Sequence, residues 1–242
     1  MTITEFDQFA DTYDDDLNRA LSASGETKEF FARGRVDHLR SCLLRLNHRP
    51  QTVLDYGCGV GDTSPLLRDL LGAESVVGLD VSVRSLDVAN VRYKSPVCSF
   101  ATFDDFAPSA TIDLAYCNGV FHHIPIIRRA AAVDFVYRCL RPGGIFALWE
   151  NNPWNPGTRY VMSQCVFDQD AITLNSLEAR RMLVSRGFEP LGTDYLFFFP
   201  TLARALRFLE PHLSRVPFGA QYQVLCQKPL SAQSATGPVS GG

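Results

Sequence analysis

Residues 53–62 read VLDYGCGVGD, an apolar run that passes directly into three glycines at alternate positions. The run is typical of a buried strand, and the segment that follows, TSPLLRDLL at 63–71, reads as a helix. Glycine lets the backbone turn sharply and approach a ligand closely, and the start of the helix offers free N–H groups. This stretch therefore predicts a strand, a tight turn and a helix, with a nucleotide-like ligand at the turn.

The residue after the third glycine limits which ligand fits. A dinucleotide fingerprint requires glycine at position 62, where this chain has Asp62. A carboxylate there repels a pyrophosphate, whereas a sulfonium or an amino group tolerates it. A phosphate-binding P-loop is also excluded, because no Gly-Lys-Ser/Thr follows.

A second acidic residue, Asp80, ends the next apolar run, SVVGLD at 75–80. A carboxylate at the end of this strand can accept hydrogen bonds from both hydroxyls of a ribose, and it disfavours a 2′-phosphate. Each feature also has a structural interpretation, since glycines make tight turns and Asp80 can cap the following helix. Together, at this spacing, they predict a ligand with a free ribose.

Outward from this stretch, apolar runs alternate with helical patterns. We expect an α/β fold: a Rossmann-like, doubly wound, mostly parallel seven-stranded sheet with one antiparallel strand and helices on both faces. The carboxyl ends of parallel strands then share one edge, where the ligand binds. The expected strands are 52–56, 75–80, 95–100, 111–117, 144–150, 188–199 and 220–228, and the expected helices are 63–71, 82–92, 126–140 and 175–187.

Three other segments of the chain show different patterns. Residues 25–50 carry an apolar stripe at helical spacing, which predicts a packed helix closed by Pro50, with His38 and His48 facing solvent. The stretch NNPWNPGTRY at 151–160 is too rich in Pro, Asn and Gly to continue a strand or start a helix, so it reads as a loop. The tail 230–242 lacks core-forming residues and is expected to be disordered.

Composition narrows the class of protein. The chain has 242 residues, 46% of them hydrophobic and 20% charged, which fits a single globular domain. Its formal net charge of −3 provides no basic field for a nucleic acid, and no run is long enough for a membrane span. The amino terminus is acidic, without the apolar core of an export signal. The seven scattered cysteines form no C-x-x-C pair, which favours reduced thiols in a cytoplasm over disulfides or a zinc site, and no metal ligand is assigned.

Several motifs together carry a family resemblance that covers roughly residues 6–190. They are FDQFADTYDD at 6–15, LDYGCGVGD at 54–62, GLDVS at 78–82, FD at 103–104, IDLAYCNGVFHHI at 112–124 and LRPGGIFALWENN at 140–152. The set resembles the class I S-adenosylmethionine-dependent methyltransferases that act on small molecules. The resemblance implies one methyltransferase domain over 1–229, with a helical lid at 1–50, a cofactor-binding half at 51–150 and a substrate-side half at 151–229.

The same resemblance assigns the cofactor site residue by residue. Gly57, Gly59 and Gly61 pass close to the cofactor, and Asp55 holds the methionine ammonium through water. Asp80 binds the ribose, Asp104 the adenine amino group with Phe103 beside the ring, and Asn118 offers backbone near the sulfonium. Tyr13 reaches the methionine carboxylate from the lid. The full set is Tyr13, Asp55, Gly57, Cys58, Gly59, Gly61, Asp80, Val81, Phe103, Asp104 and Asn118.

Catalytic and acceptor residues are expected at the same sheet edge. Methyl transfer is an in-line displacement that depends on alignment, and it needs a base only for a protonated acceptor. His123 is the candidate base and His122 a weaker one, although histidines in this turn are also compatible with packing roles. The loop after Glu150 is expected to wall the acceptor site, through Asn151, Asn152, Trp154, Arg159 and Tyr160. Both asparagines alternatively satisfy turn backbone.

The sequence therefore predicts a cytoplasmic enzyme that transfers a methyl group from S-adenosyl-L-methionine to an O, N or C atom of a small, partly apolar acceptor. The alternatives are a macromolecular methyltransferase, a non-catalytic S-adenosylmethionine-binding module and, more remotely, a nucleotide-dependent oxidoreductase. No nucleic-acid partner is expected, because the chain has no basic extension. The acceptor and the oligomeric state do not follow from the sequence.

Overall fold

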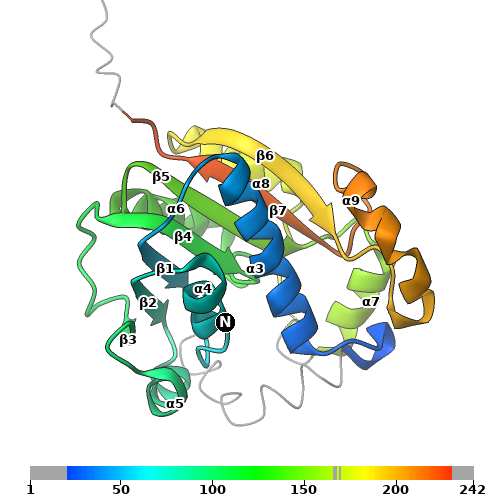
Figure 1. Cartoon of the computed structure of the whole chain (residues 1–242), viewed down its shortest axis with the longest axis horizontal. Helices are drawn as coiled ribbons and strands as arrows, with labels where there is room; N and C mark the ends of the chain where they lie inside the picture. Colours follow the sequence, from blue (N-terminus) through cyan, green and yellow to red (C-terminus); the bar gives the residue numbers. More distant parts are fainter. Residues whose placement is uncertain (1–20, 166–167, 169, 231–242) are drawn as a thin grey trace, which may run out of the picture.

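A computed structural model describes residues 21–165, 168 and 170–230 of the chain. Its centre is a seven-stranded sheet in the order β3-β2-β1-β4-β5-β7-β6 (Figure 1). The strands are β1 (Thr52–Tyr56), β2 (Ser75–Asp80), β3 (Cys98–Thr102), β4 (Ile112–Asn118), β5 (Leu140–Asn151), β6 (Glu189–Leu196) and β7 (Gln221–Gln227). Only β7 runs against its neighbours, pairing antiparallel with both β5 and β6. The predicted sheet with one reversed strand is confirmed.

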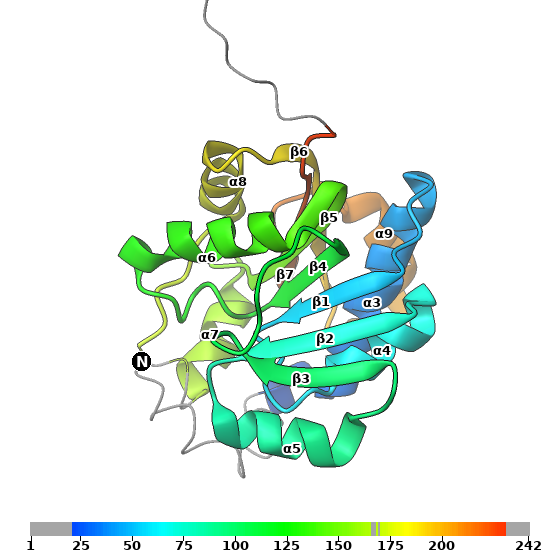
Figure 2. The same cartoon turned by 90° about the vertical axis from the view of Figure 1, so that its left-hand side faces the viewer.

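Helices cover both faces of the sheet, as the doubly wound prediction requires. The helices are α3 (Lys28–Arg45), α4 (Thr63–Leu71), α5 (Val83–Tyr93), α6 (Ile126–Cys139), α7 (Pro156–Gln164), α8 (Ser176–Ser185) and α9 (Glu210–Leu213), with 3-10 helices η1 (Ser22–Ser24) and η3 (Thr201–Leu209). One buried cluster joins α6 and α8 to the sheet, and a second joins α3, α4 and α5 to it. Figure 2 shows α6 and α5 on opposite sides of the strands.

Helix α3 belongs to the core, and this corrects part of the expected lid over residues 1–50. Val36 and Leu39 have no exposed surface and pack in the cluster with α4 and the sheet. The helix ends at Arg45 rather than at Pro50, so Leu46 lies beyond the apolar stripe. This face of α3 therefore packs on the sheet as part of the core. Residues 1–20, including Tyr13, lie outside the described part of the chain, as does 231–242 of the expected disordered tail.

The two histidines of this region do not face solvent as expected. His38 contacts Asp194 through Nε2 at 3.3 Å and stacks edge-on against Trp149. Burial alone lowers the pKa of His38, but its hydrogen bonds to Asp194 and Cys42 outweigh that effect and raise it to about 9. His48 is half-buried, and its Nε2 is enclosed without a hydrogen-bond partner.

The segment after β5 also differs from the predicted loop. Helix α7 starts at Pro156, with the Asn155 side chain accepting a hydrogen bond from the backbone N–H of Thr158 at 2.9 Å. Asparagine at the N-cap and proline in the first helical turn favour the start of a helix. The Asn and Pro residues that predicted a loop therefore begin α7 instead. Among the helices of the described residues, none is both long and apolar enough to cross a membrane.

Candidate active site

The three glycines after β1 all have left-handed backbone, but they serve different purposes. Their φ angles are 73° at Gly57, 54° at Gly59 and 82° at Gly61. A Cβ at Gly57 would lie 2.3 Å from Cγ2 of Val120, and one at Gly61 would lie 2.9 Å from Phe100. A Cβ at Gly59 would meet no atom of the described residues within 4 Å. Gly57 and Gly61 are therefore required by packing, whereas Gly59 borders open space.

That space is a cavity of about 1180 Å³ at the carboxyl edge of β1, β2 and β4. It is lined by seven of the predicted cofactor residues, namely Gly57, Gly59, Asp80, Val81, Phe103, Asp104 and Asn118. Cys58 and Gly61 do not line it. Cys58 instead belongs to the apolar layer beneath the turn, where its Sγ would lie 2.9 Å from a Cβ at Gly78.

Asp80 holds the turn from the end of β2. Its Oδ2 accepts a hydrogen bond from the backbone N–H of Gly59 at 2.8 Å, and its Oδ1 accepts one from Ser82 at 2.9 Å. Helix α5 is capped by Ser82, whose side chain accepts a hydrogen bond from the backbone N–H of Ser85, so Asp80 does not cap this helix. Asp80 also lines the cavity.

Asp55 and Asp62, both expected at the edge of the ligand, lie away from the cavity. Asp55 is buried below the turn and accepts a hydrogen bond from Ser64 Oγ at 2.7 Å. Burial raises the pKa of Asp55 to about 7, with Ser64 opposing and Asp80 reinforcing the shift. Asp62 forms an ion pair with Lys28 and accepts a hydrogen bond from Tyr93 Oη at 2.6 Å. It therefore ties helices together instead of facing a ligand.

The histidine pair after β4 forms a cluster with two carboxylates. His122 Nδ1 lies 2.5 Å from Glu150 Oε2, and the other carboxylate oxygen of Glu150 accepts the backbone N–H of Phe121 at 2.7 Å. Nε2 of His122 and Nε2 of His123 both approach Oδ1 of Asp168, at 3.3 and 3.4 Å. Burial alone lowers the pKa of His122, but Glu150 and Asp168 outweigh it and raise that pKa to about 10.

His123 lies in the same cluster with the opposite pKa shift. Burial, and then the charge of His122, lower the pKa of His123 to about 3. A general base works best when its pKa lies near the operating pH, so an imidazole shifted this far accepts a hydroxyl proton poorly. His122 is buried and engaged by Glu150. The roles assigned to His122 and His123 as bases remain predictions, and this geometry does not favour them.

The acceptor residues predicted after Glu150 separate into two groups. Asn151 and Tyr160 line the cavity, whereas Trp154 and Arg159 do not. Asn152 is fully buried, and its side-chain amide donates to the carbonyls of Pro217 and Gly219 and accepts from the N–H of Trp154. This arrangement favours the alternative in which Asn152 satisfies turn backbone, because the loop backbone uses its hydrogen-bonding groups, and its substrate role stays a prediction.

The far side of the cavity is an aromatic wall, in which the run Phe197–Phe199, interpreted from the sequence as apolar surface, meets Phe30 and Phe31, to which the sequence assigned no role. The rings of Phe30 and Phe31 pack against Phe197 with centroids 5.9 and 4.9 Å apart, and all three line the cavity. A Cβ at Gly34 would lie 2.7 Å from the ring of Phe197, so glycine there makes room for the ring. Adjacent phenylalanines in the sequence indicate apolar segments, but they do not show which of these segments meet in the fold.

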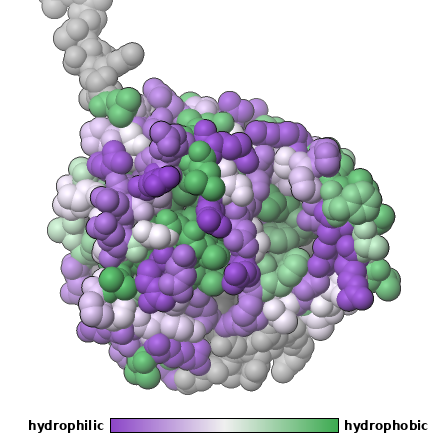
Figure 3. All heavy atoms as spheres, in the orientation of Figure 1, coloured by the Kyte–Doolittle hydropathy of each residue, from purple (hydrophilic) through white to green (hydrophobic). Residues whose placement is uncertain are grey.

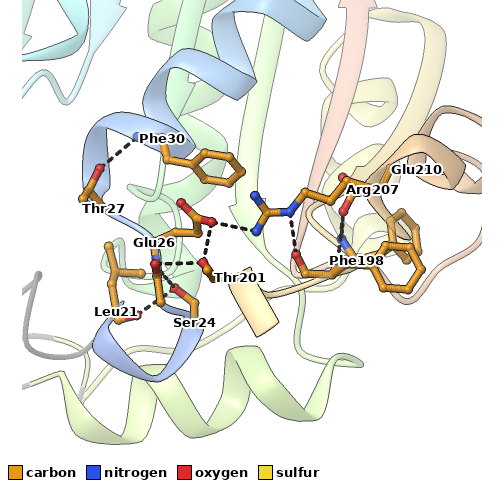
Figure 4. A network of polar contacts seen from close by, with 11 residues as sticks. Leu21, Ser24, Glu26, Thr27, Phe30, Phe198, Thr201, Arg207 and Glu210 are labelled. Atoms are coloured by element: carbon orange, nitrogen blue, oxygen red, sulfur yellow. Dashed lines mark hydrogen bonds and ion pairs between the residues drawn. The ribbon is translucent and has the colours of Figure 1, made fainter. Parts of the chain in front are cut away.

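Polar contacts join the two segments that carry this wall (Figure 4). Glu26 accepts hydrogen bonds from Thr201 Oγ1 at 2.5 Å and from Arg207 at 2.7 Å. The Arg207 guanidinium lies 4.7 Å above the ring of Phe30. The start of α3 is thereby fastened to η3, although they are far apart in the sequence.

Comparison with known proteins agrees with this arrangement. A family model described as a methyltransferase domain matches residues 53–144, which contain β1 to β4, the glycine turn and Asp80. Residues 53–144 of the chain are thus similar to a methyltransferase domain. A trans-aconitate 2-methyltransferase from Azoarcus sp. (strain BH72) is 34% identical over 119 residues, which are 49% of this chain and 46% of that protein. The chain thus matches about half the length of its curated relatives.

Solved structures share the fold of this chain over more of its length. An S-adenosylmethionine-dependent methyltransferase from Mesorhizobium loti covers 73% of this chain and 90% of its own, with a TM-score of 0.54 and 21% identity. One from Archaeoglobus fulgidus covers 80% and 94%, with a TM-score of 0.58 and 16% identity. At this level of identity the likeness shows the fold alone.

Proposed function

We propose that this protein transfers a methyl group from S-adenosylmethionine to an O, N or C atom of a small-molecule acceptor. One observation carries the proposal: a single cavity joins the glycine turn and the acidic strand ends to an aromatic wall. Such a cavity is large enough to hold a nucleoside cofactor beside a second molecule, since ligand pockets are usually about 300–1,000 Å³. Bringing the two reactants into line is the main requirement of the displacement.

The charge of the cofactor half supports S-adenosylmethionine over a dinucleotide. Asp80 and Asp104 line this half. S-adenosylmethionine is a sulfonium without phosphates, so two carboxylates suit its positive charge and its ribose and adenine donors. Asp55 would act from below the turn, through a water, on the methionine ammonium.

The acceptor half supports a partly apolar acceptor. Phe30, Phe31 and Phe197 line it, and the guanidinium of Arg207, which also lines the cavity, is paired with Glu26. The family match ends at residue 144, before α7 and η3, so the acceptor named for the relatives does not transfer with it. We infer an acceptor with an apolar body and a nucleophilic atom that reaches the edge of β4.

We also infer that the enzyme works in the cytoplasm. All seven cysteines are free thiols, and six of them are buried. Reduced thiols of this kind are typical of proteins kept in a reducing compartment.

The test begins with calorimetric titration of the full-length chain with S-adenosylhomocysteine and, separately, with NADH. Binding of S-adenosylhomocysteine without binding of NADH is expected, and the reverse would reject the cofactor assignment. Incubation with methyl-labelled S-adenosylmethionine and a metabolite extract then identifies the acceptor. Label transferred only to protein or nucleic acid would favour a macromolecular methyltransferase, and binding without any transfer would favour a non-catalytic module.

A further inference from the structure

The histidine cluster has the composition of a metal site. His122, His123 and Asp168 each offer one ligand atom, and these three atoms all lie within 4.8 Å of one another. All three residues line the cavity. Backbone hydrogen bonds hold the Asp168 segment beside the histidines, because Asp168 N–H donates to Cys165 and Ile172 N–H donates to the carbonyl of His122.

The spacing within the cluster suits ligands of one ion better than hydrogen-bonded partners. Nε2 of His122 and Nε2 of His123 lie 3.3 and 3.4 Å from the same Asp168 oxygen. Charge-assisted N–H···O bonds are usually shorter, at about 2.7–2.9 Å. Two ligand atoms that each lie about 2.1 Å from a tetrahedral ion are about 3.4 Å apart. Both nitrogens are thus spaced from the Asp168 oxygen as ligands in adjacent coordination positions would be, and all three atoms lie within 4.8 Å of one another.

A buried carboxylate, that of Glu150, contacts the second ring nitrogen of His122. Glu150 is 1% exposed and contacts His122 Nδ1, which leaves Nε2 of the same ring for Asp168 and the cavity side. In metal sites the second ring nitrogen of a ligating histidine commonly donates to a carboxylate, which fixes the orientation of the ring and strengthens the ligand.

We propose that His122, His123 and Asp168 bind one divalent transition-metal ion at the edge of the cavity, with Glu150 orienting His122. Two imidazoles and one carboxylate suit Fe²⁺, Co²⁺ or Zn²⁺, whereas Mg²⁺ and Ca²⁺ prefer oxygen ligands alone. The ion borders the space assigned to the acceptor. If the proposed function holds, an acceptor oxygen bound to the ion has a lowered pKa, which removes the need for a histidine base.

A second group of possible ligands, His38, Cys42 and Asp194, provides the internal comparison. Two arginines already engage it, with Arg215 at 3.3 Å from Asp194 and Arg45 donating to Cys42 Sγ at 3.2 Å. Cations in these positions compete with a metal ion for the ligand atoms. None of the three residues lines the cavity.

The test uses Co²⁺ as the probe on full-length protein treated with a chelator and then dialysed. We expect one equivalent to bind, with visible d–d absorption and no sulfur-to-metal charge-transfer band. Asp168→Ala is expected to weaken Co²⁺ binding by about a hundredfold or more, and Glu150→Gln by about 10–100-fold. Asp170→Ala is the matched control, because Asp170 is an exposed aspartate of the same segment, and Cys42→Ala controls for the second group.

Two results would overturn the proposal. One is the absence of stoichiometric Co²⁺ binding to wild-type protein. The other is binding that Cys42→Ala abolishes and Asp168→Ala leaves unchanged. Circular dichroism spectra establish that each variant is folded. The titration needs neither cofactor nor turnover, and titration with S-adenosylhomocysteine tests the proposed function separately, so the two can fail independently.

Discussion

Gly59 and Gly72 form a matched pair that tests whether the glycine turn contacts the cofactor. Both have left-handed backbone, with φ of 54° and 71°, and within the part of the chain that the structure describes a Cβ at either position meets no atom within 4 Å. Gly59 lines the cavity, whereas Gly72 caps the C-terminus of α4. Alanine at either position therefore costs a similar backbone strain, about 1–2 kcal/mol, and adds no clash within the protein.

The two substitutions should differ in their effect on the affinity for S-adenosylhomocysteine. Gly59→Ala places a methyl group in the space assigned to the cofactor, and overpacking of that kind costs about 1–3 kcal/mol, which is roughly a 5- to 150-fold weaker affinity. Gly72→Ala should leave the affinity unchanged. Calorimetric titration with S-adenosylhomocysteine measures both values. Thermal unfolding should show a similar loss in the two variants, roughly 2–4 °C for each kcal/mol in a chain of this size.

Equal affinities of the two variants and the wild type for S-adenosylhomocysteine would refute the placement of the cofactor against the turn. Gly57→Ala provides a further contrast, because its Cβ would lie 2.3 Å from Val120. That variant should lose more stability than either of the others, and a melting temperature equal to that of Gly72→Ala would contradict the packing argument.

Three further predictions follow from the same contacts. Asp80→Ala should weaken S-adenosylhomocysteine binding by about 1.5–3 kcal/mol, the range for hydrogen bonds to a charged group, and unchanged calorimetric affinity in the folded variant would remove Asp80 from the site. The pKa of His38 in the folded protein, about 9, exceeds its ordinary value of 6.5, so its pairing with Asp194 stabilises the fold fully below pH 6.5 and less as the pH rises through 9. Urea unfolding from pH 6 to 10 should therefore show a smaller loss of stability in His38→Gln than in wild type. The comparison isolates His38 from His122, whose pKa is also raised but which both proteins retain. Identical pH profiles of the two proteins would contradict this account. Asn152→Ala should lower the free energy of unfolding by about 2–4 kcal/mol, because buried backbone groups lose their partners, and a urea midpoint within error of wild type would reject that account.

The first half of the fold could be predicted because its signals are local. The apolar runs of β1, β2 and β4, the alternate glycines and the acidic ends of the strands each lie within a few residues. The right-handed connection between parallel strands then brings those ends to one edge without knowledge of any contact. For this reason Asp80, Asp104 and Asn118 were placed together correctly, and all three line one cavity.

The sequence by itself therefore determined the sheet, the position of the glycine turn and most of the residues that line the cavity at the ends of the strands. It did not distinguish Gly59, which borders the cavity, from Gly61, which packs against Phe100, because both occupy the same repeating pattern. Nor did it separate Asn151 from Asn152, since that depends on which loop carbonyls come within reach.

Only the tertiary structure decided the acceptor side. Asp168 meets the histidines, and Phe30 meets Phe197, across long stretches of chain. No periodicity or local motif encodes these contacts, because they arise when loops and helix ends from different layers pack at one sheet edge. The same packing places Glu150 and Asp168 around His122, so the charge state of the histidine pair is a property of the fold rather than of the residues.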